Sequence, residues 1–211
     1  MPLKKNLCRN WKLYVITDPG ALKAASIEGA VRLAVEGGAS AVQLRDKKAS
    51  NAELISLAKK LLAITRPKGV PLLVNDRALV AKLSGADGLH LGQGDGSLAK
   101  ARALLGEEAL IGRSTHSPEQ ALAAEKDGFD YIGVGPVFAT PTKPGAQPVG
   151  LELVRFAAAN VRIPFVAIGG IDAGNIRQVS EAGAKTVAVV RAVMCAEDPK
   201  RAAEDLRKRL K

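Results

Sequence analysis

Short hydrophobic runs alternate with longer segments of helical periodicity along this chain. The runs contain few polar positions, which is typical of strands that are buried on both faces. Strands are predicted at residues 13–17, 41–45, 71–75, 88–91, 109–113, 131–134, 164–168 and 186–190. Helices are predicted between them, at residues 27–36, 51–65, 77–83, 98–105, 118–126, 151–160, 174–182 and 199–210.

Capping residues agree with several of these boundaries. Ser26 precedes the first predicted helix, and Gly37 and Gly38 follow it. Ser117 stands directly before Pro118, which puts a capping residue ahead of a proline at the first helical position. These signals support the helix boundaries independently of the hydrophobic pattern.

The order of the elements predicts the architecture. Eight successive strand–helix pairs with strands of the parallel type predict an α/β fold, a (β/α)8 TIM barrel. The 211 residues are fewer than the ~250 of a usual barrel, so the connecting loops should be short. No linker or low-complexity segment interrupts the pattern, and we expect a single barrel domain over residues 1–211. An open, doubly wound parallel sheet is the alternative.

Composition narrows the class of protein further. Hydrophobic residues make up 47% of the chain, but no apolar run approaches the ~18 residues of a membrane span. The first residues lack the apolar stretch of a signal peptide. Cys8 and Cys195 are the only cysteines and belong to no CxxC or Cys/His cluster. We therefore expect no membrane association, no zinc, and free thiols in a cytoplasmic protein.

The formal net charge of +10 raises the question of a nucleic-acid partner. Only 3% of the residues are aromatic, which leaves few surfaces on which bases could stack. Much of the positive excess also lies near the two ends of the chain. We therefore expect no nucleic-acid partner, and basic residues in a cleft would instead suit a small polyanionic substrate.

Polar side chains collect where the predicted strands end. In a barrel of this type, functional residues come from the C-terminal ends of the strands. Asp76 and Asp95 follow the third and fourth predicted strands with no Cys or His cluster beside them. Oxygen ligands of this kind suit Mg²⁺. Asp95 stands between Gly94 and Gly96, so an ordinary turn residue is the alternative there.

Residues 130–150, DYIGVGPVFATPTKPGAQPVG, lead from a predicted strand into a loop rich in proline and glycine. The loop contains Thr140, Thr142 and Lys143, which offer hydroxyl and ammonium donors without a negative charge. Together with Arg45 and Lys47, which follow the second strand, they suit a phosphorylated ligand. A turn-rich loop would also contain such residues for structural reasons alone.

The two histidines do not indicate nucleophilic catalysis. His90 lies within a predicted buried strand, and we interpret it as a core histidine whose hydrogen bonds are satisfied. His116 has no Cys or Asp at a triad-like place, so no hydrolase constellation emerges.

The motifs LYVITD, AVQLRDK, LLVNDRALVA, ADGLHLGQGD, IGRSTHS, YIGVGPVFATPTK and VAIGGI occur in this order. Through this set, which covers about residues 13–194, the chain resembles the thiamine phosphate synthase family. The resemblance implies a (β/α)8 barrel and a transferase of thiamine biosynthesis. Members condense 4-amino-5-hydroxymethyl-2-methylpyrimidine diphosphate with a thiazole phosphate, in some members its carboxylated form. The products are thiamine phosphate and diphosphate.

The resemblance also implies a set of site residues. Mg²⁺ is the implied cofactor, with Asp76 and Asp95 as its ligands. The residues implied to contact the pyrimidine diphosphate are Gln43, Arg45, Lys47, Asn75, Ser114 and Lys143. Those implied around the thiazole phosphate are Thr140, Thr142, Gly170 and Val190, and Leu44, Asp46 and Pro141 complete the expected substrate-binding set. Arg45, Lys47, Ser114 and Lys143 are expected to be catalytic, through stabilisation of the departing diphosphate.

Arg191 departs from the family pattern, which usually has a small hydroxyl residue near the end of the eighth strand. We predict that its guanidinium points toward the thiazole phosphate, because a forked and permanently charged donor suits phosphate. The alternative is a side chain that turns outward and pairs with Glu197 or Asp198.

Two other functions are compatible with a barrel of this kind. A related subfamily isomerises the thiazole phosphate, and a non-catalytic barrel could bind thiamine phosphate without turnover. The isomerase lacks the full diphosphate and metal set, so the presence of Gln43, Asn75 and Asp76 favours the synthase. The expected partners are the two small-molecule substrates. A second copy of the chain, in a homodimer, is the other partner that the resemblance allows.

Overall fold

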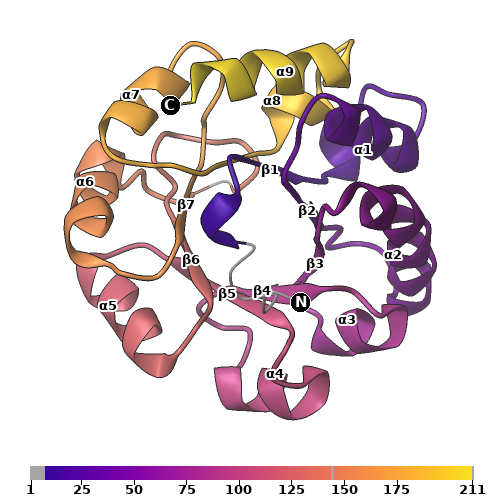
Figure 1. Cartoon of the computed structure of the whole chain (residues 1–211), viewed down its shortest axis with the longest axis horizontal. Coiled ribbons are helices and arrows are strands. Elements are labelled where there is room, and N and C mark those ends of the chain that lie inside the picture. Colours follow the sequence, from indigo (N-terminus) through magenta and orange to yellow (C-terminus); the bar gives the residue numbers. More distant parts are fainter. Residues whose placement is uncertain (1–7, 144, 211) are drawn as a thin grey trace.

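The computed structural model describes residues 8–143 and 145–210. Eight parallel strands close into a barrel in chain order, and the helices surround it (Figure 1). The strands are β1 (Leu13–Ile16), β2 (Ala41–Leu44), β3 (Leu72–Asn75), β4 (Gly88–Leu91), β5 (Leu110–Thr115), β6 (Tyr131–Val134), β7 (Phe165–Ile168) and β8 (Val187–Val189). The predicted barrel is confirmed, and the open sheet is excluded because β8 pairs with β1.

The helices follow the strands in the expected alternation. They are α1 (Ile27–Glu36), α2 (Asn51–Thr65), α3 (Ala78–Ser84), α4 (Leu98–Leu105), α5 (Pro118–Asp127), α6 (Gly150–Asn160), α7 (Ile176–Glu181), α8 (Arg191–Met194) and α9 (Pro199–Arg209). Two short 3-10 turns, η2 (Pro19–Ala21) and η3 (Arg66–Lys68), lie after β1 and α2. The caps behave as predicted, since the Ser26 and Ser117 hydroxyls accept from the backbone N–H groups of Gly29 and Gln120.

Two boundaries differ from the sequence prediction in a way that affects the site. Strand β5 continues past Arg113 to Thr115, because Ser114 and Thr115 pair with Gly133 and Val134 of β6. Ser114 is therefore held on a strand and not on a loop. A short helix, α8, also begins directly after β8 and places Arg191 at its first position.

The core has two layers because alternate strand residues face opposite sides of the barrel wall. The outer layer packs the strands against the helices, with buried residues such as Leu13, Val15 and Leu44. The inner layer fills the barrel itself, and Tyr14 and Tyr131 are its largest strand residues. Small neighbours make room for these rings: a Cβ at Gly112 would lie only 2.1 Å from the Tyr131 ring.

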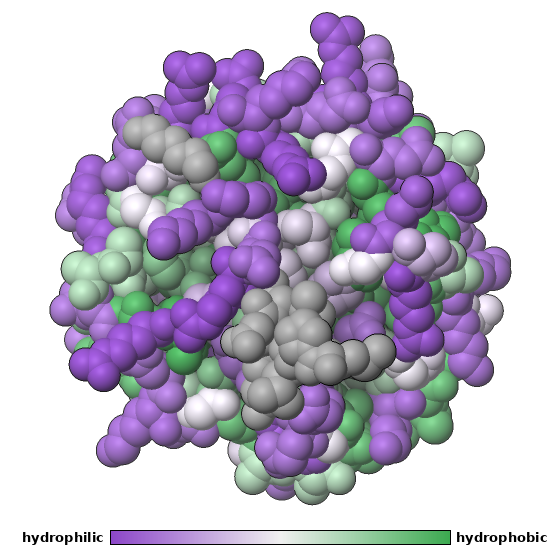
Figure 2. Space-filling view, viewed as in Figure 1, coloured by the Kyte–Doolittle hydropathy of each residue, from purple (hydrophilic) through white to green (hydrophobic). Residues whose placement is uncertain are grey.

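The N-terminal end of the barrel is closed by the residues before β1. The first described residues lie at the centre of the ring (Figure 1), and Trp11 is 3% exposed there. Its ring centroid is 5.3 Å from that of Tyr14 and 5.2 Å from that of Tyr131. Thr186, just before β8, donates a hydrogen bond to the Trp11 carbonyl at 2.8 Å. In the same view, hydrophilic side chains dominate the outer part of this face (Figure 2).

Among the described residues, no helix combines the length and the apolar character that crossing a membrane requires. Cys8 is buried and Cys195 partly buried, and neither forms a disulfide among the described residues. The expectation that both cysteines remain thiols is therefore confirmed.

Candidate active site

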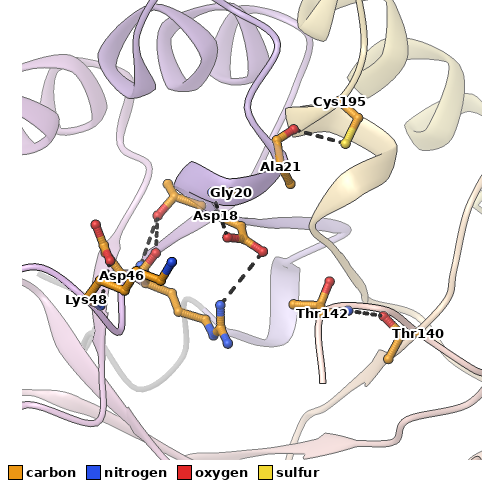
Figure 3. Close-up of polar contacts among 10 residues, drawn as sticks. Asp18, Gly20, Ala21, Asp46, Lys48, Thr140, Thr142 and Cys195 are labelled. Carbon is orange, nitrogen blue, oxygen red and sulfur yellow. Dashed lines mark hydrogen bonds and ion pairs between the residues drawn. The ribbon is translucent and has the colours of Figure 1, made fainter. Parts of the chain in front are cut away.

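A cavity of about 460 Å³ opens at the C-terminal end of the barrel. Loops after several strands gather around it: Figure 3 shows the segments of Asp18, Asp46, Thr140 and Cys195 at this end. The predicted site residues that line the cavity are Gln43, Arg45, Asn75, Ser114, Thr140, Pro141, Thr142, Lys143, Gly170, Val190 and Arg191. Most of the predicted binding set is therefore brought together.

Other predicted residues lie outside the cavity wall. Leu44 is 1% exposed and packs in the outer layer, so its side chain does not reach the substrate cavity, because it alternates with Gln43 along β2. The Asp46 carboxylate accepts hydrogen bonds from the backbone N–H groups of Lys48 and Ala49 (Figure 3), and so shapes its own loop. Three predicted residues remain, Lys47, Asp76 and Asp95. Their charges act on Lys143, which lines the cavity. The charges of Lys47 and Asp95 also act on Asp76.

Cations concentrate on one side of the cavity. Burial lowers the pKa of Lys143, and the positive charges of Lys47 and Arg45 lower it further. In the described part of the chain, the ion pair of Arg45 is a long one, with 3.9 Å between its guanidinium and the Asp18 carboxylate. The three positive side chains repel one another, and a bound anion would relieve this repulsion. A diphosphate site requires such a cluster of positive charge.

The two predicted metal ligands lie next to each other. Burial raises the pKa of Asp76 to about 6, and a hydrogen bond to Asp95 and the charge of Asp95 add to this effect. Asp76 also has a φ of 62°, which makes it the only non-glycine residue with a positive φ among the described residues. Such strain is found mainly at functional sites.

Asp95 satisfies both interpretations of its position. Its carboxylate accepts a hydrogen bond of 2.7 Å from the Gly92 N–H, as a turn residue would, yet it also faces Asp76. No cluster of three or more potential metal-binding side chains occurs among the described residues. Two adjacent carboxylates nevertheless fit Mg²⁺, which usually takes one or two protein carboxylates together with substrate phosphates and waters.

Two arginines that the sequence analysis missed hold the charged loops in place. Arg77 donates to the carbonyl oxygens of Ala49 at 2.7 Å and of Lys47 at 3.4 Å, which anchors the loop after β2. Arg113 donates to the carbonyl oxygens of Gly96 and Gln93 on either side of Asp95. Both would have been hard to detect, because their partners are backbone atoms of neighbouring loops.

Near Gly170 the cavity lining includes one acidic and one basic residue, Asp172 and Arg191. Gly170 has a φ of 62°, and a Cβ there would lie 2.5 Å from the Ala139 carbonyl oxygen, so only glycine fits. The Thr140 hydroxyl accepts from the Thr142 N–H at 3.3 Å (Figure 3). Arg191 is exposed at the cavity edge. Within residues 8–143 and 145–210, it forms no ion pair with Glu197 or Asp198.

The floor of the cavity is a chain of hydrogen bonds across the barrel. The Gln43 amide donates to the Tyr14 hydroxyl at 2.9 Å, and the two tyrosine hydroxyls are 3.1 Å apart. The Tyr131 hydroxyl lies 2.8 Å from His90 Nδ1, and His90 Nε2 lies 3.0 Å from the Ser114 hydroxyl. His90 is thus a satisfied interior histidine, as predicted, and burial lowers its pKa to about 3.

The fold and this cavity together define a class of protein. A (β/α)8 barrel with a cation cluster, an acidic pair and a glycine-containing cavity lining at the C-terminal ends of its strands is typical of an enzyme that acts on phosphorylated substrates.

Comparison with known proteins gives the family. The family described as Thiamine monophosphate synthase matches residues 13–193, and the chain belongs to this family. A thiamine-phosphate synthase of Chloroflexus aurantiacus is 48% identical over 199 residues, which cover 94% of this chain and 92% of the relative. One of Thermus thermophilus is 48% identical over 202 residues, covering 94% of this chain and 97% of the relative.

A solved structure agrees with these relatives. The thiamine phosphate pyrophosphorylase from Pyrococcus furiosus superimposes with a TM-score of 0.89 and 43% identity, and the match covers 97% of both chains. The predicted family, the thiamine phosphate synthase function and the transferase class are therefore confirmed.

Proposed function

We propose that this protein joins a 4-aminopyrimidine methyl diphosphate to a thiazole phosphate, with release of diphosphate and formation of thiamine phosphate. The observation that carries the proposal is that two sets of anion-binding groups surround one cavity. The cation cluster of Arg45, Lys47 and Lys143 suits a diphosphate, whereas the surroundings of Gly170 and Thr140, with Arg191 at the cavity edge, suit a second, singly phosphorylated ring. One cavity can therefore hold both substrates.

The chemistry needs charge stabilisation more than acid–base catalysis. Loss of diphosphate from the pyrimidine methylene leaves a cation that the ring stabilises, and a neutral ring nitrogen of the thiazole then attacks it. Arg45, Lys47 and Lys143 would stabilise the negative charge that develops on the departing diphosphate. Holding both rings in one enclosed cavity would orient the attacking nitrogen. No general base is required, which agrees with the neutral state of His90.

Asp76 and Asp95 would hold Mg²⁺ beside this cluster, and the bound ion would supply Lewis-acid stabilisation of the diphosphate oxygens. The protein's own contribution there is positional. Arg113 fixes the backbone on both sides of Asp95, and the strained backbone of Asp76 directs that carboxylate toward its neighbour. The reduced state of Cys8 and Cys195, which form no disulfide within the described residues, supports a cytoplasmic location.

The test is direct. The purified protein is incubated with both substrates and Mg²⁺, and thiamine phosphate and diphosphate are measured over time. We expect equimolar formation of both products, with loss of activity on chelation of the metal and recovery on its return. Binding of thiamine phosphate without turnover would instead identify a non-catalytic barrel, and conversion of the thiazole phosphate alone would identify an isomerase.

A further inference from the structure

The chain of hydrogen bonds on the cavity floor has a direction. It runs from Gln43 through Tyr14, Tyr131 and His90 to Ser114, with its four links between 2.8 and 3.1 Å. Each tyrosine hydroxyl has one hydrogen to donate, and a neutral imidazole has one N–H. A hydroxyl oxygen can accept two hydrogen bonds, but Tyr14 and Tyr131 are buried, and a buried hydroxyl hydrogen without an acceptor is costly. When every hydrogen of this chain is donated to a neighbour, donation at one end sets the donor at every later link.

The orientation of Gln43 selects one of the two self-consistent directions. Its Nε2 donates to the Tyr14 hydroxyl, so Tyr14 must donate to Tyr131, and Tyr131 must donate to His90 Nδ1. The imidazole hydrogen then lies on Nε2 and is donated to the Ser114 oxygen. Ser114 keeps its own hydroxyl hydrogen for a ligand, and Gln43 keeps its Oε1.

An anion in the cavity would favour the same direction. Both ring nitrogens of His90 already lie within hydrogen-bond distance of hydroxyl groups, Nδ1 at 2.8 Å and Nε2 at 3.0 Å, so one can accept while the other donates. An anion held by Lys143 would lie near Ser114, and a hydroxyl beside an anion must donate a hydrogen. An anion bound beside Ser114 therefore favours the hydrogen-bond direction in which Gln43, at the other end, keeps its Oε1 as an acceptor.

We propose that the Tyr14–Tyr131–His90 chain determines the specificity for the pyrimidine ring by fixing Gln43 as a hydrogen-bond acceptor. Gln43 Oε1 then faces the ring and accepts from an exocyclic amino group. A ring with a carbonyl oxygen at that position would put two acceptors together. Tyr14, Tyr131 and His90 also line the cavity, but their polar atoms bond to one another, to Gln43 and to Ser114, so we assign them as positioning residues. The inference rests on the proposed function, since it names the ring that the cavity takes.

The experiment compares two ring chemistries in four proteins. The substrates are the 4-amino pyrimidine diphosphate and its 4-oxo analogue, and kcat/KM and dissociation constants are measured for both. The proteins are the unmodified chain, Tyr14→Phe, Tyr131→Phe and Trp11→Phe. Trp11→Phe is the matched control, because Trp11 packs on both tyrosine rings and its indole nitrogen has no hydrogen-bond partner among the described residues.

We expect the unmodified chain to prefer the amino ring by roughly 100-fold, because opposed buried acceptors are strongly disfavoured. Tyr14→Phe and Tyr131→Phe should reduce this preference to about tenfold or less, since the Gln43 amide is then free to reverse. Trp11→Phe should keep the full preference. Circular dichroism confirms that each variant is folded before its preference is scored.

Three results would overturn the proposal. These are equal use of both rings by the unmodified chain, an unchanged preference in the folded tyrosine variants, or an equal loss in Trp11→Phe. The comparison of the two rings in the unmodified chain needs no variant. The proposal can therefore still be tested if a tyrosine variant fails to fold. If the unmodified chain makes no thiamine phosphate from the amino substrate, the proposed function fails, and this outcome is distinct from the other three.

Discussion

The two ends of the barrel are built from the same eight strands but in opposite ways. The N-terminal end is filled by the rings of Trp11, Tyr14 and Tyr131, which are 3% exposed or less and pack edge to face or tilted. The C-terminal end collects like charges instead, in a cation cluster and in the adjacent carboxylates of Asp76 and Asp95. One end therefore stabilises the fold, and the other uses part of that stability to hold repelling groups together.

The comparison gives a simple rule for mutations. Substitutions at the C-terminal end should reduce activity with little effect on the free energy of unfolding. Substitution of Trp11, which closes the N-terminal end and does not line the cavity, should do the reverse. Four variants test this rule, beginning with the largest expected effect.

Asp76→Asn should reduce kcat/KM by about 1,000-fold, because a contact to the metal is worth several kcal/mol of transition-state stabilisation. Asparagine is chosen because it tolerates the positive φ of this position. Steady-state kinetics across a range of Mg²⁺ concentrations measure the loss. Asp127→Asn, on the outer helix α5, is the control and should behave like the unmodified chain. Full activity of Asp76→Asn in excess chelator would contradict the assignment of the metal site.

Trp11→Ala should lower the free energy of unfolding by about 3 kcal/mol, as truncation of a large buried aromatic residue usually does. Urea denaturation followed by circular dichroism measures this change. The activity per folded molecule should stay within about threefold, because Trp11 does not line the cavity. A large loss of kcat at full stability would show that the two ends are not separable.

Lys143→Ala should slow the chemical step by about 100-fold, because the ammonium would stabilise the departing diphosphate. Rapid-quench single-turnover kinetics separate this step from product release. Lys126→Ala, an exposed lysine on α5, serves as the matched control. An unchanged single-turnover rate would make Lys143 an ordinary surface lysine.

Arg191→Ser should weaken binding of the thiazole phosphate by about tenfold, which is the lower end of a hydrogen bond to a charged group. Isothermal titration calorimetry measures the affinity directly. Arg191→Lys keeps the charge without the forked donor, and we expect an intermediate affinity. Equal or tighter binding by the serine variant would show that the guanidinium does not face the phosphate.

Much of this protein could be predicted from local sequence. The alternation of apolar runs and helical periods predicted the barrel, because each strand and helix must bury its own hydrophobic face. The caps at Ser26 and Ser117 were predictable because they depend on contacts only three residues away. The positions of Gln43, Arg45 and Lys143 at the cavity followed from the rule that strand ends gather at one end of a barrel.

Other features depend on contacts that only the closed barrel creates. Tyr14 and Tyr131 are 117 residues apart, and their hydroxyls meet because the closed barrel directs both side chains inward. Their apolar surroundings in sequence gave no sign of a polar chain through the core. The anchoring of the charged loops by Arg77 and Arg113 was likewise missed, because backbone carbonyl oxygens carry no side-chain signal.

The sequence by itself determined the architecture, most helix starts and the types of residue at the active end, since these follow from local periodicity and spacing. Only the tertiary structure decided which strand residues face inward together, that Leu44 faces the helices, and that Asp76 and Asp95 repel each other. The physical reason is that charge coupling and hydrogen-bond direction depend on distances across the barrel. Those distances are set by the closure and register of all eight strands.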